Sequence, residues 1–314
     1  MARLRTLQID CHPDVDVPLT LSFSLGTNVV FGPDGPSRRR LMRLLCGVTT
    51  GDFSYTDEPI DLLTTFAIPG GEAEVHIART ETGGPVSVTQ GEETRTIEEP
   101  PEGHRHLICD GTDALLMALH NDDGLRAPQW LPPALAHTAH QSEAGAPVEV
   151  NLRGIPELAG LWWHLDYERG FITLTEPGGR LDLKLHADDV VRSIADLTAE
   201  QRALASMYLY LSCRPTPFFD APLDHLSDEA VDDLLRHVEP PMFGGVPRRQ
   251  SFFAADSSAL LYRMLIKRPE DVQQALVVCR PGVPWRKLDE AEAAKYYQFY
   301  EREFRHIDSL MRLW

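Results

Sequence analysis

The sequence has few cysteines, no long hydrophobic run and no surplus of basic residues. Its five cysteines are scattered over 314 residues without a CxxC pair, which indicates reduced thiols in a cytosol. No window approaches the roughly 20 apolar residues of a membrane span. The first residues, MARLRTLQID, lack the apolar core of a secretion signal. These absences predict a cytoplasmic protein without a membrane partner.

The charge of the chain is strongly one-sided. With 47 acidic against 30 basic residues, the formal net charge is -17. Such a field opposes a phosphate polymer as the main partner, although a local basic patch could survive it. A hydrophobic fraction of 43% and a charged fraction of 25% are ordinary for a globular protein with its own core. The composition therefore disfavours nucleic acid as a partner without excluding it.

The order of the apolar patterns predicts an α/β protein. Near the N-terminus, RLRTLQID and LTLSFSLGTNVVF alternate apolar and polar residues, and a series of hairpin strands follows over residues 64–99. One helix is expected between them at residues 39–46, ended by Gly47. In the second half, a helix at 197–211 and the nearly all-apolar strands TPFFDAP, QSFFAADSS and QALVVCR indicate a buried, largely parallel sheet.

The stretch VVFGPDGPSRRRLMRLLCG, residues 29–47, has the outline of a phosphate-binding loop. In the pattern GxxxxGK[ST], main-chain N–H groups and a helix start hold the phosphates, the lysine reaches the terminal ones, and the hydroxyl binds Mg²⁺. Here a serine and two arginines occupy the last three positions of the pattern. Alone, the stretch is better explained by a strand, a turn and a helix with a basic start. The candidate nucleotide-binding residues are Gly32, Asp34, Gly35, Ser37, Arg38, Arg39 and Arg40.

Segments in the second half resemble the signature helix, the Walker B strand and the switch strand of ABC-type ATPases. LTAEQR is similar to the signature turn at Thr198 and Gln201, while Glu200 replaces a glycine. Three aspartates follow at the places of the Mg²⁺-binding residue, the acidic residue of the next loop and the switch histidine: Asp220, Asp224 and Asp256. Four segments in the right order form a strong joint signal, although each one is degraded.

The β-rich region after the loop and the long insertion make the chain similar to SMC/RecF-like heads, in which a coiled coil or helical lid separates two lobes. The resemblance covers roughly residues 3–110 and 181–279, and no heptad run lies between them. It implies an ABC-type head with a mixed, largely parallel sheet, an N-terminal antiparallel β lobe and an inserted helical lid. The expected parts are an N-terminal lobe, a lid and a C-terminal lobe, at residues 1–118, 119–180 and 181–314.

Departures from the family pattern bear on its chemistry, which is ATP hydrolysis between two protomers. Ala221 stands where the family has a water-polarising glutamate, and alanine has no group that accepts a proton. Asp256 and Glu200 place carboxylates where phosphate charge would develop, and Arg39 places a cation at the metal position. The resemblance with these departures implies a pseudo-ATPase, with no assigned catalytic residue and no metal ligand.

Two arrangements of the arginines are open. In one hypothesis, Arg38 or Arg39 pairs with Asp220 and fills the metal site, because a buried carboxylate needs a partner. In the other, Arg38 still binds a phosphate and Arg39 takes the place of the metal.

Three functions are compatible with this pattern. The first is a structural or regulatory subunit that associates with an active ATPase, a nuclease subunit or a second copy of itself, as in genome maintenance or defence, and needs no cofactor. The second is a weak or composite-site ATPase that binds ATP and Mg²⁺ and lends Thr198 and Gln201 to an active partner head. The third is a nucleic-acid-binding module that uses the Arg38–Arg40 cluster with Arg43.

Several other side chains are better explained by packing or solvation than by a site. The histidines His104, His106, His137 and His140 lack a third metal ligand at a fixed spacing. Ser257 and Ser258 lack a nucleophile-elbow pattern, and the thiol of Cys213 follows an apolar helix. A predicted C-terminal helix, residues 289–314, carries an aromatic stripe that fits its own sheet or a partner protein.

Overall fold

The computed structural model describes residues 2–16, 18–31, 35–53, 56–97, 148–151, 170–175, 182–187, 190–193, 197–213, 216–220, 249–255, 276–280 and 283–287, with the single residues 108, 226, 230, 234 and 291. The chain divides into two units, one formed by Met1–Pro100 with Gln250–Trp314 and the other by Pro101–Arg249. The expected boundaries at 118 and 180 stay predictions.

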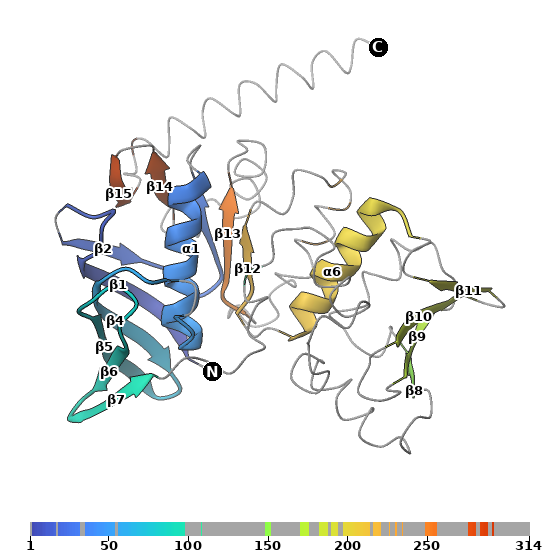
Figure 1. The fold of residues 1–314 in the computed structure, drawn as a ribbon, viewed down its shortest axis with the longest axis horizontal. Helices are drawn as coiled ribbons and strands as arrows, with labels where there is room; N and C mark the ends of the chain where they lie inside the picture. Colours follow the sequence, from blue (N-terminus) through green and yellow to red (C-terminus); the bar gives the residue numbers. More distant parts are fainter. Residues whose placement is uncertain are drawn as a thin grey trace, which may run out of the picture. The chain divides into compact units, whose positions relative to one another are not determined.

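The first unit contains a six-stranded antiparallel sheet (Figure 1). Its strand order is β2 (Leu19–Ser22), β1 (Arg3–Cys11), β4 (Ile60–Ile68), β5 (Gly71–Arg79), β6 (Val86–Gln90) and β7 (Glu93–Ile97). The last four strands are the predicted series of hairpins. Period-2 alternation sets the register, because each strand sends one set of side chains to the core. One buried row across the sheet consists of Ile9, Leu62, Ile77 and Val88.

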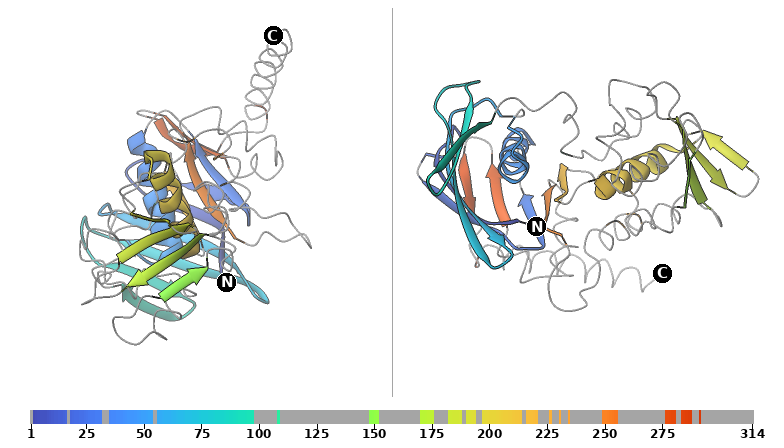
Figure 2. Two further views of the ribbon diagram at one scale, coloured as in Figure 1. Left: turned by 90° about the vertical axis from the view of Figure 1, so that its right-hand side faces the viewer. Right: turned by 90° about the horizontal axis from the view of Figure 1, so that it is seen from below.

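A second group of strands in this unit is mostly parallel, as predicted. The central strand β3 (Thr27–Phe31) pairs in parallel with β13 (Ser251–Ala255) on one side and β14 (Leu276–Arg280) on the other. All five residues of β3 are buried, as in strands covered on both faces. The six-stranded sheet curves around these strands (Figure 2).

The sequence pattern missed two features of these strands. LTLSFSLGTNVVF contains two strands, β2 and β3, that belong to different sheets. The strand β15 (Val283–Lys287) was not expected, and it pairs antiparallel with β14 at the edge of the sheet. Proline has no N–H to donate to a neighbouring strand, so Pro284 is compatible with an edge strand. It also interrupts the alternation of apolar and polar residues by which a strand is predicted from sequence.

Helix α1 (Gly35–Thr50) follows β3 and packs on β3, β13 and β14. It is longer at both ends than the predicted 39–46. Gly47 does not end it: a Cβ there would lie 2.6 Å from Cδ1 of Phe53, so this glycine allows the ring to pack against the helix. The helix ends at Thr50 and is followed by Gly51, whose φ of 77° is the left-handed conformation that glycine adopts readily and whose N–H donates to the carbonyl of Gly47 at 2.8 Å.

The buried Gln250 links the two ends of the first unit. Its Oε1 accepts from the N–H of Leu4 at 2.8 Å, and its Nε2 donates to the carbonyls of Leu4 at 2.6 Å and Ser24 at 2.8 Å. Only 2% of Gln250 is exposed, so water cannot replace these bonds. One amide therefore holds the start of β13 against β1.

The described part of the second unit has its own antiparallel sheet, in the order β11 (Val190–Ser193), β10 (Asp182–Ala187), β9 (Gly170–Thr175) and β8 (Val148–Asn151). The lid was expected to be helical, but its described residues, in β8 and β9, are strands, so the helical lid is not confirmed.

The predicted helix and strand that follow are α6 (Ala199–Cys213) and β12 (Phe218–Asp220). The hydroxyl of Tyr210 joins them, because it accepts from the N–H of Phe218 at 2.7 Å and lies 3.1 Å from its carbonyl. Among the described residues, no helix is long and apolar enough to cross a membrane. Of the predicted C-terminal helix the structure describes Ala291, which is helical, and the rest of that helix, the candidate histidines and the two serines lie outside the described residues.

We expect Gln250→Ala to destabilise the first unit by roughly 3 kcal/mol. The change leaves buried main-chain groups without hydrogen-bond partners, and each such group costs about 1–3 kcal/mol. Amide hydrogen exchange in β1 and β13 measures this loss. Gln8→Ala is the matched control, since the Gln8 side chain bonds the exposed Asp10 on its own strand, and it should change stability by less than about 0.5 kcal/mol. Equal losses in the two variants would contradict the assignment.

Candidate functional site

The predicted phosphate-loop residues that the structure describes lie in the first turns of α1. Gly35 begins the helix, whereas Gly32 and Asp34 lie outside the described residues. Successive helix positions differ by about 100° in direction. Ser37 and Arg38 are consequently buried, Arg39 is exposed, and Arg40 is half-buried. The run of arginines in the sequence is therefore not a single cationic surface in the fold.

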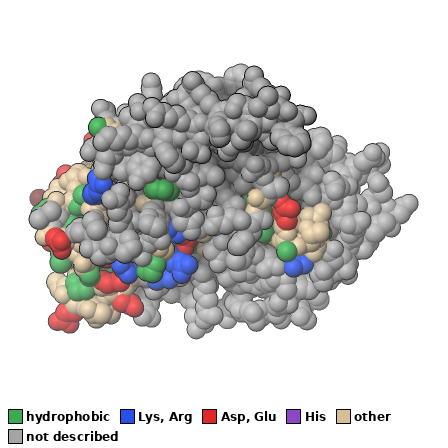
Figure 3. Space-filling model, turned by 90° about the horizontal axis from the view of Figure 1, so that it is seen from above, with side chains coloured by type: hydrophobic (Ala, Val, Ile, Leu, Met, Phe, Trp, Pro, Cys, Tyr) green, Lys and Arg blue, Asp and Glu red, His purple; other side chains and the backbone are tan. Residues whose placement is uncertain are grey.

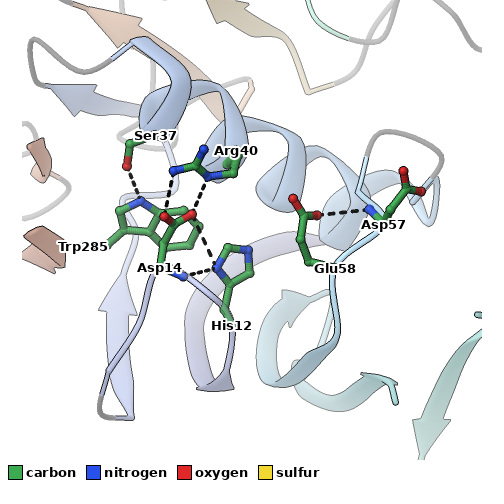
Figure 4. Close-up of polar contacts among 7 residues, drawn as sticks. All are labelled: His12, Asp14, Ser37, Arg40, Asp57, Glu58 and Trp285. Carbon is green, nitrogen blue, oxygen red and sulfur yellow. Dashed lines mark hydrogen bonds and ion pairs between the residues drawn. The ribbon is translucent and has the colours of Figure 1, made fainter. Parts of the chain in front are cut away.

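The Ser37 hydroxyl has a hydrogen-bond partner that lies far from it in the sequence. Nε1 of Trp285, on β15, donates a hydrogen bond to Ser37 Oγ at 2.7 Å (Figure 4). Trp285 is 2% exposed. A buried indole N–H is only a donor and requires an acceptor within the protein. Ser37, at the second glycine position of the phosphate-loop pattern, provides that acceptor.

Arg40 is held by Asp14, which lies in the turn between β1 and β2. Its Nε and Nη2 donate to the two carboxylate oxygens of Asp14 at 2.5 and 2.7 Å, a bidentate pair (Figure 4). The same turn meets β15, because the N–H of Trp285 donates to the carbonyl of Asp14 at 3.2 Å. Helix α1, the β1–β2 turn and β15 thus meet at one point.

His12 lies at the centre of this meeting point. Its ring stacks on the Trp285 indole with centroids 4.5 Å apart and planes 34° apart. Its Nδ1 accepts a hydrogen bond from the N–H of Asp14 at 3.1 Å, which places the proton of the neutral ring on Nε2. Burial lowers the pKa of His12, and Arg40 acts in the same direction, while Asp14 and Glu58 oppose it. The ring is therefore neutral at neutral pH.

Arg79 of β5 supports the loop that follows α1. Its guanidinium donates to the carbonyl of Thr56 and, at 3.5 Å, to that of Phe53. Burial lowers the pKa of Arg79, while Asp57 and Glu58 raise it. This loop carries Glu58, whose carboxylate accepts from the N–H of Asp57 at 3.0 Å (Figure 4) and whose charge raises the pKa of His12.

The predicted signature residues form a capping box at the start of α6. The N–H of Thr198 donates to Gln201 Oε1 at 3.0 Å, and the N–H of Gln201 donates to Thr198 Oγ1 at 3.2 Å. Glu200 lies in the first turn, where a carboxylate favours the helix dipole. Helix capping alone therefore accounts for the residue types that match the signature motif.

Asp220 is half-buried at the end of β12 and belongs to the second unit, whereas Arg38 and Arg39 belong to the first. The predicted ion pair between them stays a prediction. Ala221, Asp224 and Asp256 lie outside the described residues. In the described part of the chain, no three His, Cys, Asp or Glu side chains come together as metal ligands.

Sequence reasoning missed His12, Asp14 and Trp285, which surround the start of α1. The signal for the first two was the short segment HPDV after an alternating strand, typical of a turn. Nothing in the sequence indicated Trp285, because its contacts to Ser37 and His12 span most of the chain.

Comparison with known proteins gives a result only at the level of structure. No protein-family model and no curated protein matches this sequence. An SMC head bound to the C-terminal winged-helix domain of ScpA is 13% identical, with a TM-score of 0.51 over 91% of this chain and 97% of that one. The SMC head domain from Thermotoga maritima is 11% identical, with a TM-score of 0.50 over 91% of this chain and 99% of that one.

A third solved structure is an SMC head with an extended coiled coil, bound to the C-terminal domain of ScpA derived from Pyrococcus furiosus. It is 11% identical, with a TM-score of 0.50 over 96% of this chain and 100% of that one. This chain has the fold of an SMC head. The ABC-type ATPase fold expected from the sequence is therefore confirmed, and identity this low shows the fold alone.

We expect Ser37→Ala and Trp285→Phe to be coupled in a double-mutant cycle. Ser37→Ala leaves a buried indole N–H without its acceptor, at a cost of about 1–3 kcal/mol. Once Trp285→Phe has removed the donor, the same serine change should cost about 1 kcal/mol less. Urea unfolding of the four proteins measures the coupling. Thr50→Ala, at the other end of α1, should be additive with Trp285→Phe; the assignment is wrong if Ser37→Ala is additive as well.

Thr198→Ala should cost about 1 kcal/mol of local stability at the start of α6, the usual loss for an N-cap hydroxyl. Amide exchange in the first turn of α6 reports the change. Thr198→Ser keeps the hydroxyl and should protect that turn nearly as well as the wild-type residue. Equal protection in the alanine variant would show that the capping box is not what holds this helix start.

Proposed function

We propose that this chain is a non-hydrolysing SMC/RecF-like head that acts as a structural or regulatory subunit of a larger cytoplasmic assembly. One observation carries the proposal: the side chains at the start of α1 bind partners in their own chain. Ser37 accepts from Trp285, and Arg40 pairs with Asp14. Between them, guanidinium groups stand where the fold family has a lysine and a hydroxyl.

Mg²⁺ does not fit the described part of this loop. The ion requires oxygen ligands in near-octahedral geometry. Arg39, at the position of the hydroxyl ligand, has only N–H donors, and the oxygen of Ser37 already accepts from a buried indole. We therefore derive no catalytic step through MgATP at this site.

Water activation is also unsupported. Ala221 follows the candidate Walker B aspartate and has no group that orients or deprotonates water. Loss of both the metal ligand and the general base removes several orders of magnitude in rate. The proposed role therefore depends on association and not on turnover.

A protein partner is the natural complement of such a head. Two of the solved SMC heads of this fold are bound to domains of ScpA. For this chain we propose a partner of the same general kind, a protein: an active ATPase head, a nuclease subunit or a second copy. The composite-site alternative is weaker, since Thr198 and Gln201 already satisfy each other's main-chain N–H groups.

Nucleic-acid binding through the arginine run is also weaker. Of the four arginines, Arg38 is buried and Arg40 is engaged by Asp14, so only Arg39 and Arg43 are exposed. Figure 3 shows Lys and Arg side chains interspersed with Asp and Glu on the described surface in that view. A mixed surface on a chain of net charge -17 gives little electrostatic attraction to a phosphate backbone.

The test measures ATP binding by titration calorimetry, with and without Mg²⁺, and phosphate release by the full chain. We expect a dissociation constant weaker than about 1 mM, less than about 4 kcal/mol of binding free energy, and no turnover. Arg38→Lys with Arg39→Thr should bind MgATP at least about tenfold more tightly, a gain of about 1.4 kcal/mol, whereas the matched change Arg43→Lys on the same helix should not. Micromolar binding by the wild-type chain, or turnover near 1 s⁻¹, would contradict the proposal.

A further inference from the structure

A buried histidine contacts the residues that hold the start of α1. His12 touches the two residues that bind this helix from outside: its ring stacks on Trp285, and its Nδ1 accepts from the N–H of Asp14. Its side chain is 1% exposed. We infer that His12 is an acid-sensitive latch, whose protonation releases the contacts of Asp14 and Trp285 with the start of α1. This inference does not depend on whether the chain binds nucleotide.

The hydrogen bond explains why the latch requires a neutral ring. Protonation turns Nδ1 from an acceptor into a donor and sets it against the N–H of Asp14, so that two donors face each other. The charge would also be buried, at a position where solvent cannot compensate it. Both effects push the ring out of its place beside Trp285.

The charged groups around the ring come from three elements. Asp14 lies on the same turn, Arg40 on α1 and Glu58 in the loop before β4, while β15 contributes the non-titrating Trp285 (Figure 4). Stacking on the indole and the two carboxylates favour the charged ring. The pKa of His12 is nevertheless lowered on balance, so burial, its largest cause, outweighs them.

Attraction between a protonated His12 ring and Asp14 does not preserve these contacts. The carboxylate of Asp14 lies 3.8 Å from Nδ1 of His12, but both of its oxygens already bind Arg40. A charged ring that stayed in place would compete with Arg40 for this carboxylate. Whether the ring leaves or stays, protonation weakens the link between the β1–β2 turn and α1.

The lowered pKa of His12 in the folded chain determines how stability changes with pH. In the unfolded chain His12 takes up its proton near the ordinary pKa of 6.5, whereas in the folded chain it does so only at lower pH. The stabilisation by the latch is therefore complete above that value and is lost as the pH falls toward the folded pKa. In this window the unfolding constant rises by at most about tenfold per pH unit.

The experiment follows the indole N–H resonance of Trp285 in the full chain, labelled with ¹⁵N-tryptophan and assigned with Trp285→Phe. As the pH is lowered from 7.5 to the point where the chain unfolds, the wild-type resonance should shift and lose its protection from exchange. His12→Asn keeps an acceptor for the N–H of Asp14 but does not titrate, so its response should be absent. His12→Phe keeps the ring but removes the acceptor, so its signal should be poorly protected at every pH.

The exposed His76 supplies the matched control. It pairs with Asp61 at 2.6 Å on the six-stranded sheet, away from Trp285. His76→Gln should leave the response of Trp285 unchanged. If His12→Asn responds to acid as the wild-type chain does, another group controls the site and the inference is wrong. A wild-type signal that stays constant until the whole chain unfolds overturns it equally.

A second measurement keeps the inference testable if His12→Asn does not fold. The Cε1–H resonance of His12 and the indole resonance of Trp285 should titrate in the wild-type chain with the same midpoint, below the ordinary histidine value of 6.5. Different midpoints, or a midpoint at or above that value, would exclude His12 as the group that acid acts on.

Discussion

The start of helix α1 is fixed by the requirement that the buried indole N–H of Trp285 find an acceptor. Ser37 supplies that acceptor, and the resulting bond ties an edge strand to the first turn of the helix. Once the indole is in place, its flat face positions His12 and its main chain positions Asp14, which in turn holds Arg40. A single donor without an alternative partner thus organises side chains from three elements.

Much of the fold could be predicted because burial leaves a periodic trace in the sequence. The hairpins β4–β7 alternate and have glycine-rich turns, and β13 and β14 are short apolar runs, so their type was evident. The edge strand β15 was not, since Pro284 interrupts its pattern. The C-terminal end of α1 was also missed. A glycine commonly marks the end of a helix, but Gly47 is required inside this one because Phe53 packs against it.

The candidate site was less predictable, since its contacts are between residues far apart in the sequence. Three successive arginines suggested one basic cluster, but helical rotation sends Arg38 inward, Arg39 outward and Arg40 toward Asp14. Thr198 and Gln201 fit two motifs at once, a nucleotide-binding signature and a capping box, and sequence alone cannot separate them. A partial motif match therefore indicates the fold more reliably than it indicates the chemistry.

The discontinuity of the first unit has a consequence for synthesis on the ribosome. Strand β3 is made early, yet both of its parallel neighbours lie beyond Gln250. At about 5–20 residues per second, this hydrophobic strand is synthesised roughly 10–45 s before β13. During that interval its apolar side chains cannot be covered by their final neighbours. Nascent chains should therefore depend on a chaperone, and truncation before β13 should give aggregates instead of a smaller folded domain.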